Sequence, residues 1–346
     1  MTKIKKHILI ARTQLTGYSS MSNSSAIALA FTLRKFYKKV SILQVNSQDD
    51  LDSILSIQPD LVFIGMKFLP LSSTKGSPDQ VKIWIAEFLE KNSIPYTGSP
   101  SSAHKLEYDK SSAKRRMNEV GIKTAQFFVS LYDQSYEINS SLTYPVFVKP
   151  LNKGGGMGID VHSVAYTEEA LCTKVADIKN TYHCDVLVEE YLAGREFSVA
   201  LLENNGQYVV MPLELIAPID SRGHRVLSSS VKSDDSEQFI AVDDEIMKSV
   251  INSFALEAFT ALHARGYGRI DIRLDNSGIP HFLEANLLPS IIENYGNFPK
   301  ACMLNEGISY EEMAVQIVEL GLGKSDSVNS NEESLLQLET IQPVLV

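Results

Sequence analysis

Two acidic residues on facing strands near the carboxyl end of the chain restrict its fold more than any other feature. Residues 268–274 and 281–286 both alternate in the manner of β-strands, and the turn sequence Asp275-Asn276-Ser277-Gly278 joins them. A loop centred on the last two residues of this turn places Asp271 directly opposite Glu284. Opposed residues of a hairpin lie about 5 Å apart at Cβ, where like charges destabilise the pair. We therefore expect a cation between the two carboxylates.

The residues around this pair indicate which cation it binds. The same register places Arg269 opposite Asn286, and alternation turns the apolar residues of the first strand to the other face. Two carboxylates and an amide oxygen are hard ligands, which suit a Mg²⁺ ion that carries a nucleotide phosphate. We expect Asp271, Glu284 and Asn286 to form this site, with Mn²⁺ as an alternative ion. Arg269 could instead serve only to pair with Asp271.

Length, charge and cysteine content exclude several classes of protein. A chain of 346 residues with 44% hydrophobic residues can form two or three packed units, because one core rarely grows beyond about 250–300 residues. The net charge of −10 argues against a nucleic-acid partner. Cys172, Cys184 and Cys302 are widely spaced and form no CxxC motif, so neither a disulfide framework nor a zinc site is expected. No apolar run approaches a membrane span or a signal segment, which predicts a cytoplasmic globular protein.

The order of apolar segments predicts three units and a tail. Short strands alternate with helical patterns over residues 1–101, which indicates parallel pairing and an open α/β domain. A second unit is expected over 102–195, a third over 196–323, and a polar tail over 324–346. The individual elements predicted are strands at 7–11, 39–44, 61–65 and 186–190, and helices at 24–37, 80–91, 111–120 and 243–264.

A glycine-rich loop at residues 154–158 follows a β-rich run that contains Lys149. Glycines allow backbone N–H groups to approach an anion closely, and a nearby lysine adds a point charge for phosphate. A tight hairpin turn would explain the glycines equally well. The loop has neither the Gly-Lys-Ser/Thr ending of a P-loop nor the spacing of the dinucleotide fingerprint, so phosphate binding here needs another arrangement.

The segment from Val186 to Glu196 reads as a buried strand, a linker and the start of a second strand. Free backbone groups in such a linker can pair with the edge of adenine, and a carboxylate can accept the ribose hydroxyls. An ordinary strand with exposed glutamates is the alternative interpretation.

Taken in order, these features resemble the ATP-grasp superfamily, and specifically the D-alanine–D-alanine ligase family. The resemblance covers about residues 94–322, with its strongest blocks at 94–98, 146–158, 186–199 and 266–289. It implies an α/β protein with the ATP-grasp fold, in which an amino-terminal open parallel α/β domain precedes two α+β subdomains that sandwich ATP.

The resemblance also implies a role for each matched residue. The family's phosphate contacts match Lys110 and Lys149, its adenine contacts match Glu189 and the Leu192 backbone, and its ribose contact matches Glu196. The matched cofactor-binding positions are therefore Lys110, Lys149, Gly155, Gly156, Glu189, Leu192 and Glu196, the metal positions are Asp271, Glu284 and Asn286, and the catalytic positions are Arg269 and Lys232. In the family, Arg269 matches the arginine that stabilises the transferring phosphate, and Lys232 matches a lysine on a loop that closes over the site. Taken singly, Lys110 and Lys232 could be ordinary solvated lysines.

The acceptor side of the site departs from the family. True D-alanine–D-alanine ligases have a glutamate after the first strand that binds the ammonium of the first alanine, and residues 12–20 contain no acidic residue here. A family serine is replaced near Gly155, the family's Asn-x-x-Pro-Gly-Met becomes residues 286–291, and its Ser-Leu pair is replaced near Tyr295. Hydroxyl-bearing and basic residues are the acceptor candidates instead, namely Arg12, Ser19, Ser20, Ser22, Ser290 and Tyr295.

The resemblance implies an ADP-forming ligase that phosphorylates a carboxylate oxygen, which an amine then displaces to form a C–N bond. The partners it implies are ATP and two small molecules, one of them an amino acid, and family members are commonly homodimers. The altered acceptor side argues against a cell-wall ligase and favours the mycosporine-like amino acid ligase branch, which the chain resembles in length and at residues 219–223. That branch joins an amino acid to mycosporine-glycine. A D-alanine–D-alanine or other dipeptide ligase is the alternative, and a nucleotide-binding module without catalysis is a third.

Overall fold

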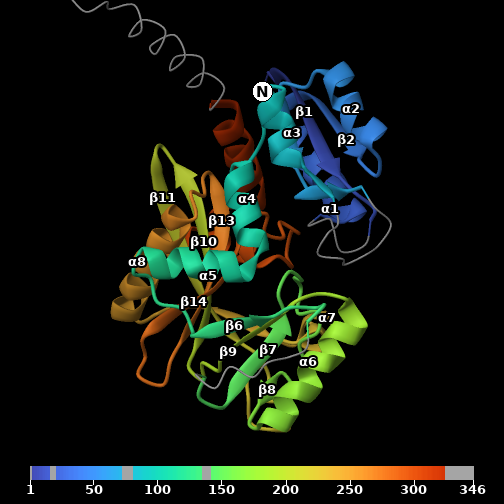
Figure 1. The fold of residues 1–346 in the computed structure, drawn as a ribbon. Helices are drawn as coiled ribbons and strands as arrows, with labels where there is room; N and C mark the ends of the chain where they lie inside the picture. The colour runs from blue at the N-terminus through green and yellow to red at the C-terminus, as the bar shows by residue number, and fades with distance from the viewer. Residues whose placement is uncertain (1, 16–20, 72–80, 135–141, 324–346) are drawn as a thin grey trace, which may run out of the picture.

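The computed structural model describes residues 2–15, 21–71, 81–134 and 142–323, and these form four β-sheets with helices packed on them (Figure 1). The first sheet is parallel. In it, β1 (Ile4–Arg12) lies between β2 (Tyr37–Gln44) and β3 (Leu61–Ile64) and pairs with both. The parallel pairing predicted for the amino-terminal region is confirmed. The helices of this part are α1 (Asn23–Leu33), α2 (Gln48–Ile57) and α3 (Ile85–Lys91).

Three predictions about this region were wrong in detail. The helix predicted to reach residue 37 ends at Leu33, and α2 was not predicted. The helix predicted over 80–91 begins only with α3, because β5 (Lys82–Trp84) pairs with β4 (Phe68–Pro70) in an antiparallel hairpin. The ring of Trp84 packs edge-on against Phe68 at 5.3 Å between centroids, so a tertiary aromatic contact overrides the helical pattern there.

The second large sheet is antiparallel, in the order β6-β9-β7-β8, and α6 (Glu168–Tyr182) packs against it through apolar side chains. Its strands are β6 (Phe127–Ser130), β7 (Val146–Pro150), β8 (Val164–Ala165) and β9 (Val186–Glu190). Two helices, α4 (Ser101–Tyr108) and α5 (Lys110–Glu119), connect the first sheet to it. Figure 1 shows α5 running across the molecule above this sheet.

The third large sheet has five antiparallel strands in the order β12-β11-β10-β13-β14. Its elements are β10 (Glu196–Asn204), β11 (Gln207–Ile216), α7 (Ser229–Ser233), β12 (Gln238–Ala241), α8 (Glu245–Ala261), β13 (Tyr267–Leu274) and β14 (Pro280–Asn286), followed by α9 (Asn297–Glu306) and a helix at 310–323. Helix α8 covers one face, where Ile270 and Ile272 are fully buried. The predicted alternation of β13 is thus confirmed, with its charged residues on the face that α8 does not cover.

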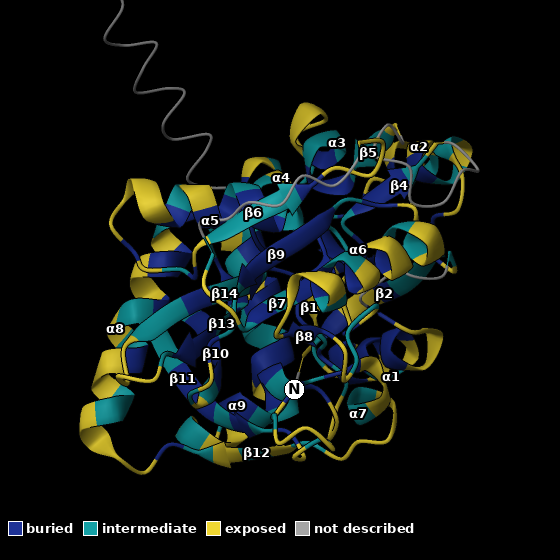
Figure 2. Cartoon of the chain, turned by 60° about the horizontal axis from the view of Figure 1, so that its bottom comes forward, coloured by how far each residue is buried: buried dark blue, intermediate teal, exposed yellow. Residues whose placement is uncertain are grey.

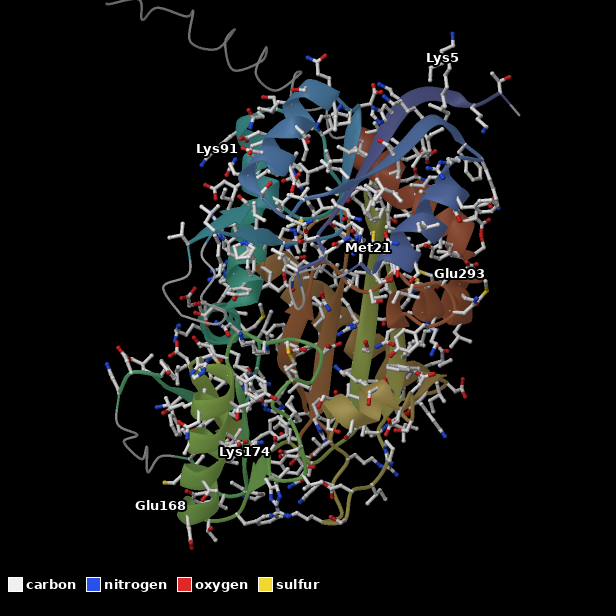
Figure 3. All side chains as sticks on the ribbon, turned by 90° about the vertical axis from the view of Figure 1, so that its right-hand side faces the viewer. Lys5, Met21, Lys91, Glu168, Lys174 and Glu293 are labelled. Carbon is white, nitrogen blue, oxygen red and sulfur yellow. The ribbon has the colours of Figure 1, made fainter. Side chains whose placement is uncertain are left out.

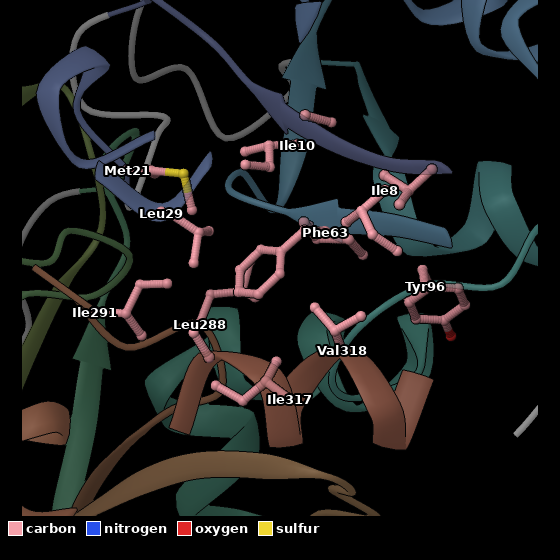
Figure 4. Close-up of a cluster of buried hydrophobic side chains, with 14 of the residues drawn as sticks. Ile8, Ile10, Met21, Leu29, Phe63, Tyr96, Leu288, Ile291, Ile317 and Val318 are labelled. Carbon is pink, nitrogen blue, oxygen red and sulfur yellow. The ribbon is translucent and has the colours of Figure 1, made fainter. Parts of the chain in front are cut away.

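One apolar cluster joins the first sheet to the end of the described chain (Figure 4). Phe63 of the first sheet lies near Leu288 from the loop after β14 and near Ile317 from the helix at 310–323. A Cβ atom at Gly321 would lie only 2.6 Å from Cδ1 of Leu61, so this helix approaches β3 more closely than a larger residue allows. The cluster therefore fixes the first sheet against the five-stranded sheet.

Burial follows the layers of the fold. The central strands β1, β9 and β10 are largely buried, whereas the edge strand β12 and the outer faces of the helices carry exposed residues (Figure 2). Charged side chains such as Lys5, Lys91 and Glu168 lie at the periphery, and Met21 lies inside the molecule (Figure 3). No helix in the described part of the chain has both the length and the apolar character that a membrane span requires.

Candidate active site

A cleft of about 830 Å³, open to solvent at its mouth, lies between the four-stranded and the five-stranded sheets. Most of the residues that the sequence singled out for nucleotide binding line it. These are Lys110, Lys149, Gly155, Gly156, Glu189, Leu192, Glu196, Lys232, Asp271 and Glu284. Residues from six separate stretches of the chain therefore converge on one space. In the described part of the chain, neither Arg269 nor Asn286 is among the lining residues.

The hairpin register at the two facing carboxylates is the one predicted. Asp271 pairs with Glu284, and Arg269 pairs with Asn286. Nearer the turn, however, the register differs by one residue, since Ile272 pairs with Phe282. A bulge restores the predicted register before the carboxylates are reached. Without it, Asp271 would face Leu283, and Glu284 would point to the opposite face of the sheet.

Contacts from α5 and the segment after it hold the bulge in place. The backbone N–H of Phe282 donates to the carbonyl of Lys123 at 2.9 Å. The carbonyl of Phe282 accepts from Thr124 Oγ1 at 2.9 Å and from Lys114 Nζ at 3.3 Å. Both backbone groups at the bulge are therefore satisfied from outside the sheet, which stabilises a local break in the ladder.

Basic side chains of the protein already neutralise the facing carboxylates. Arg269 donates to both oxygens of Asp271, at 2.9 and 2.8 Å, so the Arg269–Asp271 pair considered from the sequence is present. Lys110 Nζ lies 3.5 Å from Glu284 Oε2 and donates to the Lys153 carbonyl at 2.6 Å. Burial alone would raise the pKa of Glu284, but Lys110 and the other cations outweigh it and lower that pKa.

A buried charge triad forms the floor of the cleft. Glu189 is only 2% exposed and lies between two lysines, with its oxygens 2.8 Å from Lys114 Nζ and 2.6 Å from Lys149 Nζ. Burial opposes ionisation, yet the two lysines together lower the pKa of Glu189 to about 2. Lys114 was missed from the sequence. Its position four residues after Lys110 on α5 was the available signal, because residues at that spacing share one helix face.

The glycine loop reaches across the cleft. Gly155 and Gly156 have φ values of 66° and 76°, which other residues rarely adopt. A Cβ atom at Gly156 would lie 3.0 Å from the backbone of Ser228 and Ser229, at the start of α7. The loop therefore packs directly against the short helix that carries Lys232.

Glu196 and Arg273 form a second ion pair in the cleft. They are directly opposed on β10 and β13, and Arg273 Nη1 donates to Glu196 Oε2 at 3.0 Å. Burial raises the pKa of Glu196, and the positive charge of Arg273 opposes this shift. Arg273 was not predicted as a site residue, although the alternation of β13 placed it on the same face as Asp271.

Two of the acceptor candidates, Arg12 and Ser290, are not among the residues that line this cleft. Arg12, at the end of β1, is 5% exposed and donates from Nε to the Met21 carbonyl at 3.3 Å. Arg12 Nη1 and Ser290 Oγ are buried and have no hydrogen-bond partner among the described residues. Arg12 contacts Met21, and Ser290 directly follows Pro289; with Phe63 and Tyr267, Met21 and Pro289 line a narrow apolar gap that is too small for a water molecule.

The other acceptor candidates have different surroundings. Tyr295 is exposed, and its hydroxyl donates to the Lys232 carbonyl at 3.1 Å, which ties it to α7. Ser22 caps α1 by accepting from the N–H of Ser25. Ser19 and Ser20 lie outside the described residues, as does the predicted tail at 324–346.

A buried glutamate beyond the predicted set supports the end of β14. Glu107 accepts from the backbone N–H of Leu287 at 3.1 Å and from Lys67 Nζ at 2.5 Å. Leu287 directly follows Asn286, so this contact fixes the strand end. Within the described ranges, no group of three or more His, Cys, Asp or Glu side chains has metal-binding geometry, and the predicted site has only two carboxylates, with an amide as third donor.

Comparisons with known proteins agree with this architecture. The family described as "D-ala D-ala ligase C-terminus" matches residues 117–319. A D-alanine–D-alanine ligase of Halalkalibacterium halodurans is 31% identical over 283 residues, which cover 80% of this chain and 86% of that protein. An uncharacterised protein of Sinorhizobium fredii, y4sG, is 32% identical over 214 residues, and this chain spans only 61% of its length.

Solved structures show the same fold. The crystal structure of a D-alanine–D-alanine ligase from Bacillus anthracis complexed with ATP superimposes with a TM-score of 0.70. The match has 18% sequence identity and covers 93% of this chain and 99% of that one. The family match spans more than half of the chain, and the fold is that of the ATP-grasp ligases. The chain therefore belongs to the D-alanine–D-alanine ligase family of carbon–nitrogen ligases.

Proposed function

We propose that this protein is an ATP-dependent, ADP-forming ligase that joins the amine of an amino acid to a phosphate-activated carboxylate or vinylogous carboxylate. One observation carries the proposal: Lys110, Lys149 and Lys232 line the cleft that contains the facing pair Asp271 and Glu284. The lysines match the negative charge of a nucleoside triphosphate, and the carboxylates match the positive charge of its metal. The ATP complex of the Bacillus anthracis relative supports the choice of nucleotide.

The facing carboxylates and the neighbouring amide suit a magnesium ion. Asp271, Glu284 and Asn286 supply hard oxygen donors from adjacent positions of one hairpin. A bound Mg²⁺ would neutralise the phosphate oxygens and favour transfer of the terminal phosphoryl group. Arg269 and Lys110 pair with Asp271 and Glu284 in this structure, and we expect them to turn to phosphate oxygens when the carboxylates bind a metal.

The remaining residues bind, orient and shield the reactants. In this proposal, Lys149 and the backbone of Gly155 and Gly156 would bind the phosphates, and Leu192, which also lines the cleft, would contact adenine. The glycine loop packs against the start of α7, and we expect this contact to help cover the bound phosphates. Closure excludes water, which would otherwise hydrolyse the acyl phosphate before the amine attacks its carbon and phosphate leaves.

Two substrate classes fit this chemistry. The names of the relatives favour ligation of D-alanine to D-alanine or formation of another dipeptide. The acceptor side favours a different substrate, because a buried arginine stands at the end of β1 and no acidic residue occurs over 12–20 to bind an ammonium group. Mycosporine-glycine, which carries a carboxylate and a vinylogous carboxyl group, is the second candidate.

Product analysis separates the candidates. The purified full chain is incubated with ATP, Mg²⁺ and a panel of D- and L-amino acids, with and without mycosporine-glycine. We expect ADP and phosphate to form only with the correct pair, and mass spectrometry identifies the product. A dipeptide formed from amino acids alone selects the first candidate. An imino product that requires mycosporine-glycine selects the second.

A module that binds nucleotide without catalysis is the remaining alternative. The cleft brings three lysines and the facing carboxylates together, and Arg269 bonds one of these carboxylates from outside the lining, which a purely binding role does not require. Bound ATP that stays intact with every substrate combination would establish this alternative and overturn the proposed ligase activity.

A further inference from the structure

Arg273 lines the cleft and makes several side-chain contacts, but the proposed chemistry gives it no role. It is 8% exposed, yet it lines the cleft. Besides its bond to Glu196 on the neighbouring strand, Nη2 donates to the carbonyl of Arg225 at 2.9 Å. The guanidinium also lies 5.3 Å from the ring centroid of Tyr191, whose hydroxyl is 3.4 Å from Nη2.

These contacts fix the guanidinium from three directions. Glu196 belongs to the five-stranded sheet, Tyr191 to the linker that leaves β9, and Arg225 to the loop between β11 and α7. That loop is itself tied to the residue after β8, because Tyr166 hydrogen-bonds His224 at 2.7 Å between Oη and Nε2. A side chain held in this way has little freedom to move, so it can fix the orientation of its own partner.

The pairing leaves one carboxylate oxygen of Glu196 available. Arg273 occupies Oε2, and no hydrogen bond from the described residues reaches Oε1. Glu196 lines the cleft together with Asp271 and Glu284, two further carboxylates. A cation beside Glu196 reduces the repulsion among them, so Glu196 can remain a charged acceptor in this acidic group.

We propose that Arg273 is a positioning residue that sets the preference of the cleft for a nucleotide with ribose hydroxyls. It holds Glu196 through Oε2 and presents Oε1 to a hydroxyl of the sugar. This inference rests on the proposed nucleotide site and adds a residue that acts through Glu196 rather than through the phosphates.

Nucleotide binding, measured without turnover, tests the proposal. Calorimetric titration of the full chain with ATP and with 2′,3′-dideoxy-ATP, both with Mg²⁺, gives a preference ratio. We expect Arg273→Met to weaken ATP binding about tenfold and to leave dideoxy-ATP within about twofold, because a hydrogen bond to a charged group contributes on that scale. The ratio should therefore fall towards one.

Matched variants separate positioning from general damage. Arg195 forms a two-bond pair with Glu214 on the same sheet, at 2.8 and 2.6 Å, but neither residue lines the cleft. Arg195→Met should leave the ratio unchanged. Glu196→Gln should lower the ratio as much as Arg273→Met does, and the double variant should lose little more, because the two residues act as a unit. Arg273→Lys, which keeps the charge, should retain part of the preference and serves if Arg273→Met does not fold.

Several results would overturn the inference. The inference is wrong if the wild-type chain binds the two nucleotides equally. It is also wrong if Arg273→Met weakens the binding of both nucleotides by the same factor, which is the result expected of a residue with a merely structural role. If the two substitutions reduce the preference for ATP additively in the double variant, Arg273 does not act through Glu196. Failure of the ligase proposal gives a different result, since a chain that prefers ATP over dideoxy-ATP but forms no product leaves this inference intact.

Discussion

In the part of the chain that the structure describes, buried charges are paired in the nucleotide cleft but unpaired at the carboxyl edge of the first sheet. In the cleft, each buried carboxylate faces a basic side chain, as in the triad of Glu189 with Lys114 and Lys149. At the end of β1, Arg12 is equally buried but has no carboxylate within ion-pair distance among the described residues. Oγ of Ser290, in the loop after β14, is also buried without a hydrogen-bond partner within the described ranges.

The comparison shows in which of the two regions the buried charges are paired without a ligand. An unpaired buried charge is costly, whereas a paired one is stable until a partner is removed. The charges of the cleft are therefore balanced without a ligand. At the edge of the first sheet, Arg12 Nη1 and Ser290 Oγ have no partner among the described residues, and a ligand bound there would satisfy them.

The largest expected effect is on the metal-binding pair. Glu284→Ala removes one of the two facing carboxylates and should lower ATP turnover by at least about 10³-fold, because charge stabilisation during phosphoryl transfer is lost. Release of ADP in the presence of the accepted substrates measures it. Glu214→Ala, on the same sheet but outside the cleft, is the control. Turnover near the wild-type value in Glu284→Ala would refute the metal assignment.

Breaking the buried triad should cost stability. Glu189→Gln leaves Lys114 and Lys149 without a counter-charge, and we expect the free energy of unfolding to fall by about 3–5 kcal/mol in urea titrations. Lys35→Met breaks an exposed pair with Glu311 and should cost less than about 1 kcal/mol. Similar losses in the two variants would show that the triad is not a special feature of the cleft.

The same triad predicts a pH dependence. Its lysines lower the pKa of Glu189 from 4.5 to about 2, so the folded carboxylate stays ionised where the unfolded one is protonated. The stabilisation is fully present above pH 4.5 and is lost as the pH falls towards 2. The difference in unfolding free energy between wild type and Glu189→Gln should therefore narrow over this range. A constant difference would contradict the assignment.

Arg12→Met tests the unpaired buried charge at the carboxyl edge of the first sheet. We expect unfolding free energy to rise by about 1 kcal/mol, because an unpaired buried charge is replaced by an apolar side chain. The KM for the carboxylate substrate should rise about tenfold, as expected when a hydrogen bond to a charged group is lost, while the KM for ATP stays the same. Steady-state kinetics with the substrate identified above measures both constants. Lower stability with an unchanged substrate KM would assign Arg12 a structural role.

The smallest expected effect concerns closure of the cleft. Gly156→Ala adds a Cβ at a positive φ and against the backbone of Ser228, and it should cost about 1–2 kcal/mol of stability and raise the KM for ATP severalfold. Gly155→Ala has a similar φ but no atom within 4 Å of the added Cβ. It should show the loss of stability with little change in KM. Equal changes in KM would exclude the contact with α7 as the cause.

Much of the nucleotide cleft could be predicted because its signals are local. Alternation placed Asp271 on the polar face of β13, and the glycine loop next to Lys149 was visible as a run of residues. The partners of these groups could not be predicted in the same way. Lys114 and Arg273 acquire their roles only when α5 and β13 come against β9 and β10, so their signals were weak in the sequence.

The division into units at residues 102 and 196 and the tail at 324–346 remain predictions. The element boundaries that failed lie in the first sheet, where packing of Trp84 against Phe68 decided between strand and helix. An aromatic contact between segments sixteen residues apart leaves no periodic signal in the sequence, so the local pattern predicted a helix where the structure has a strand.

The sequence by itself determined the chemistry of the cleft: which residues are charged, which face of each strand they occupy, and in what order they follow one another. Only the tertiary structure decided that Asp271 meets Glu284. The turn sets a register one residue away from that pairing, and the bulge held by Lys114, Lys123 and Thr124 corrects it. The physical reason is that the residues on a strand face follow from local alternation, whereas its register depends on contacts from elements distant in the chain.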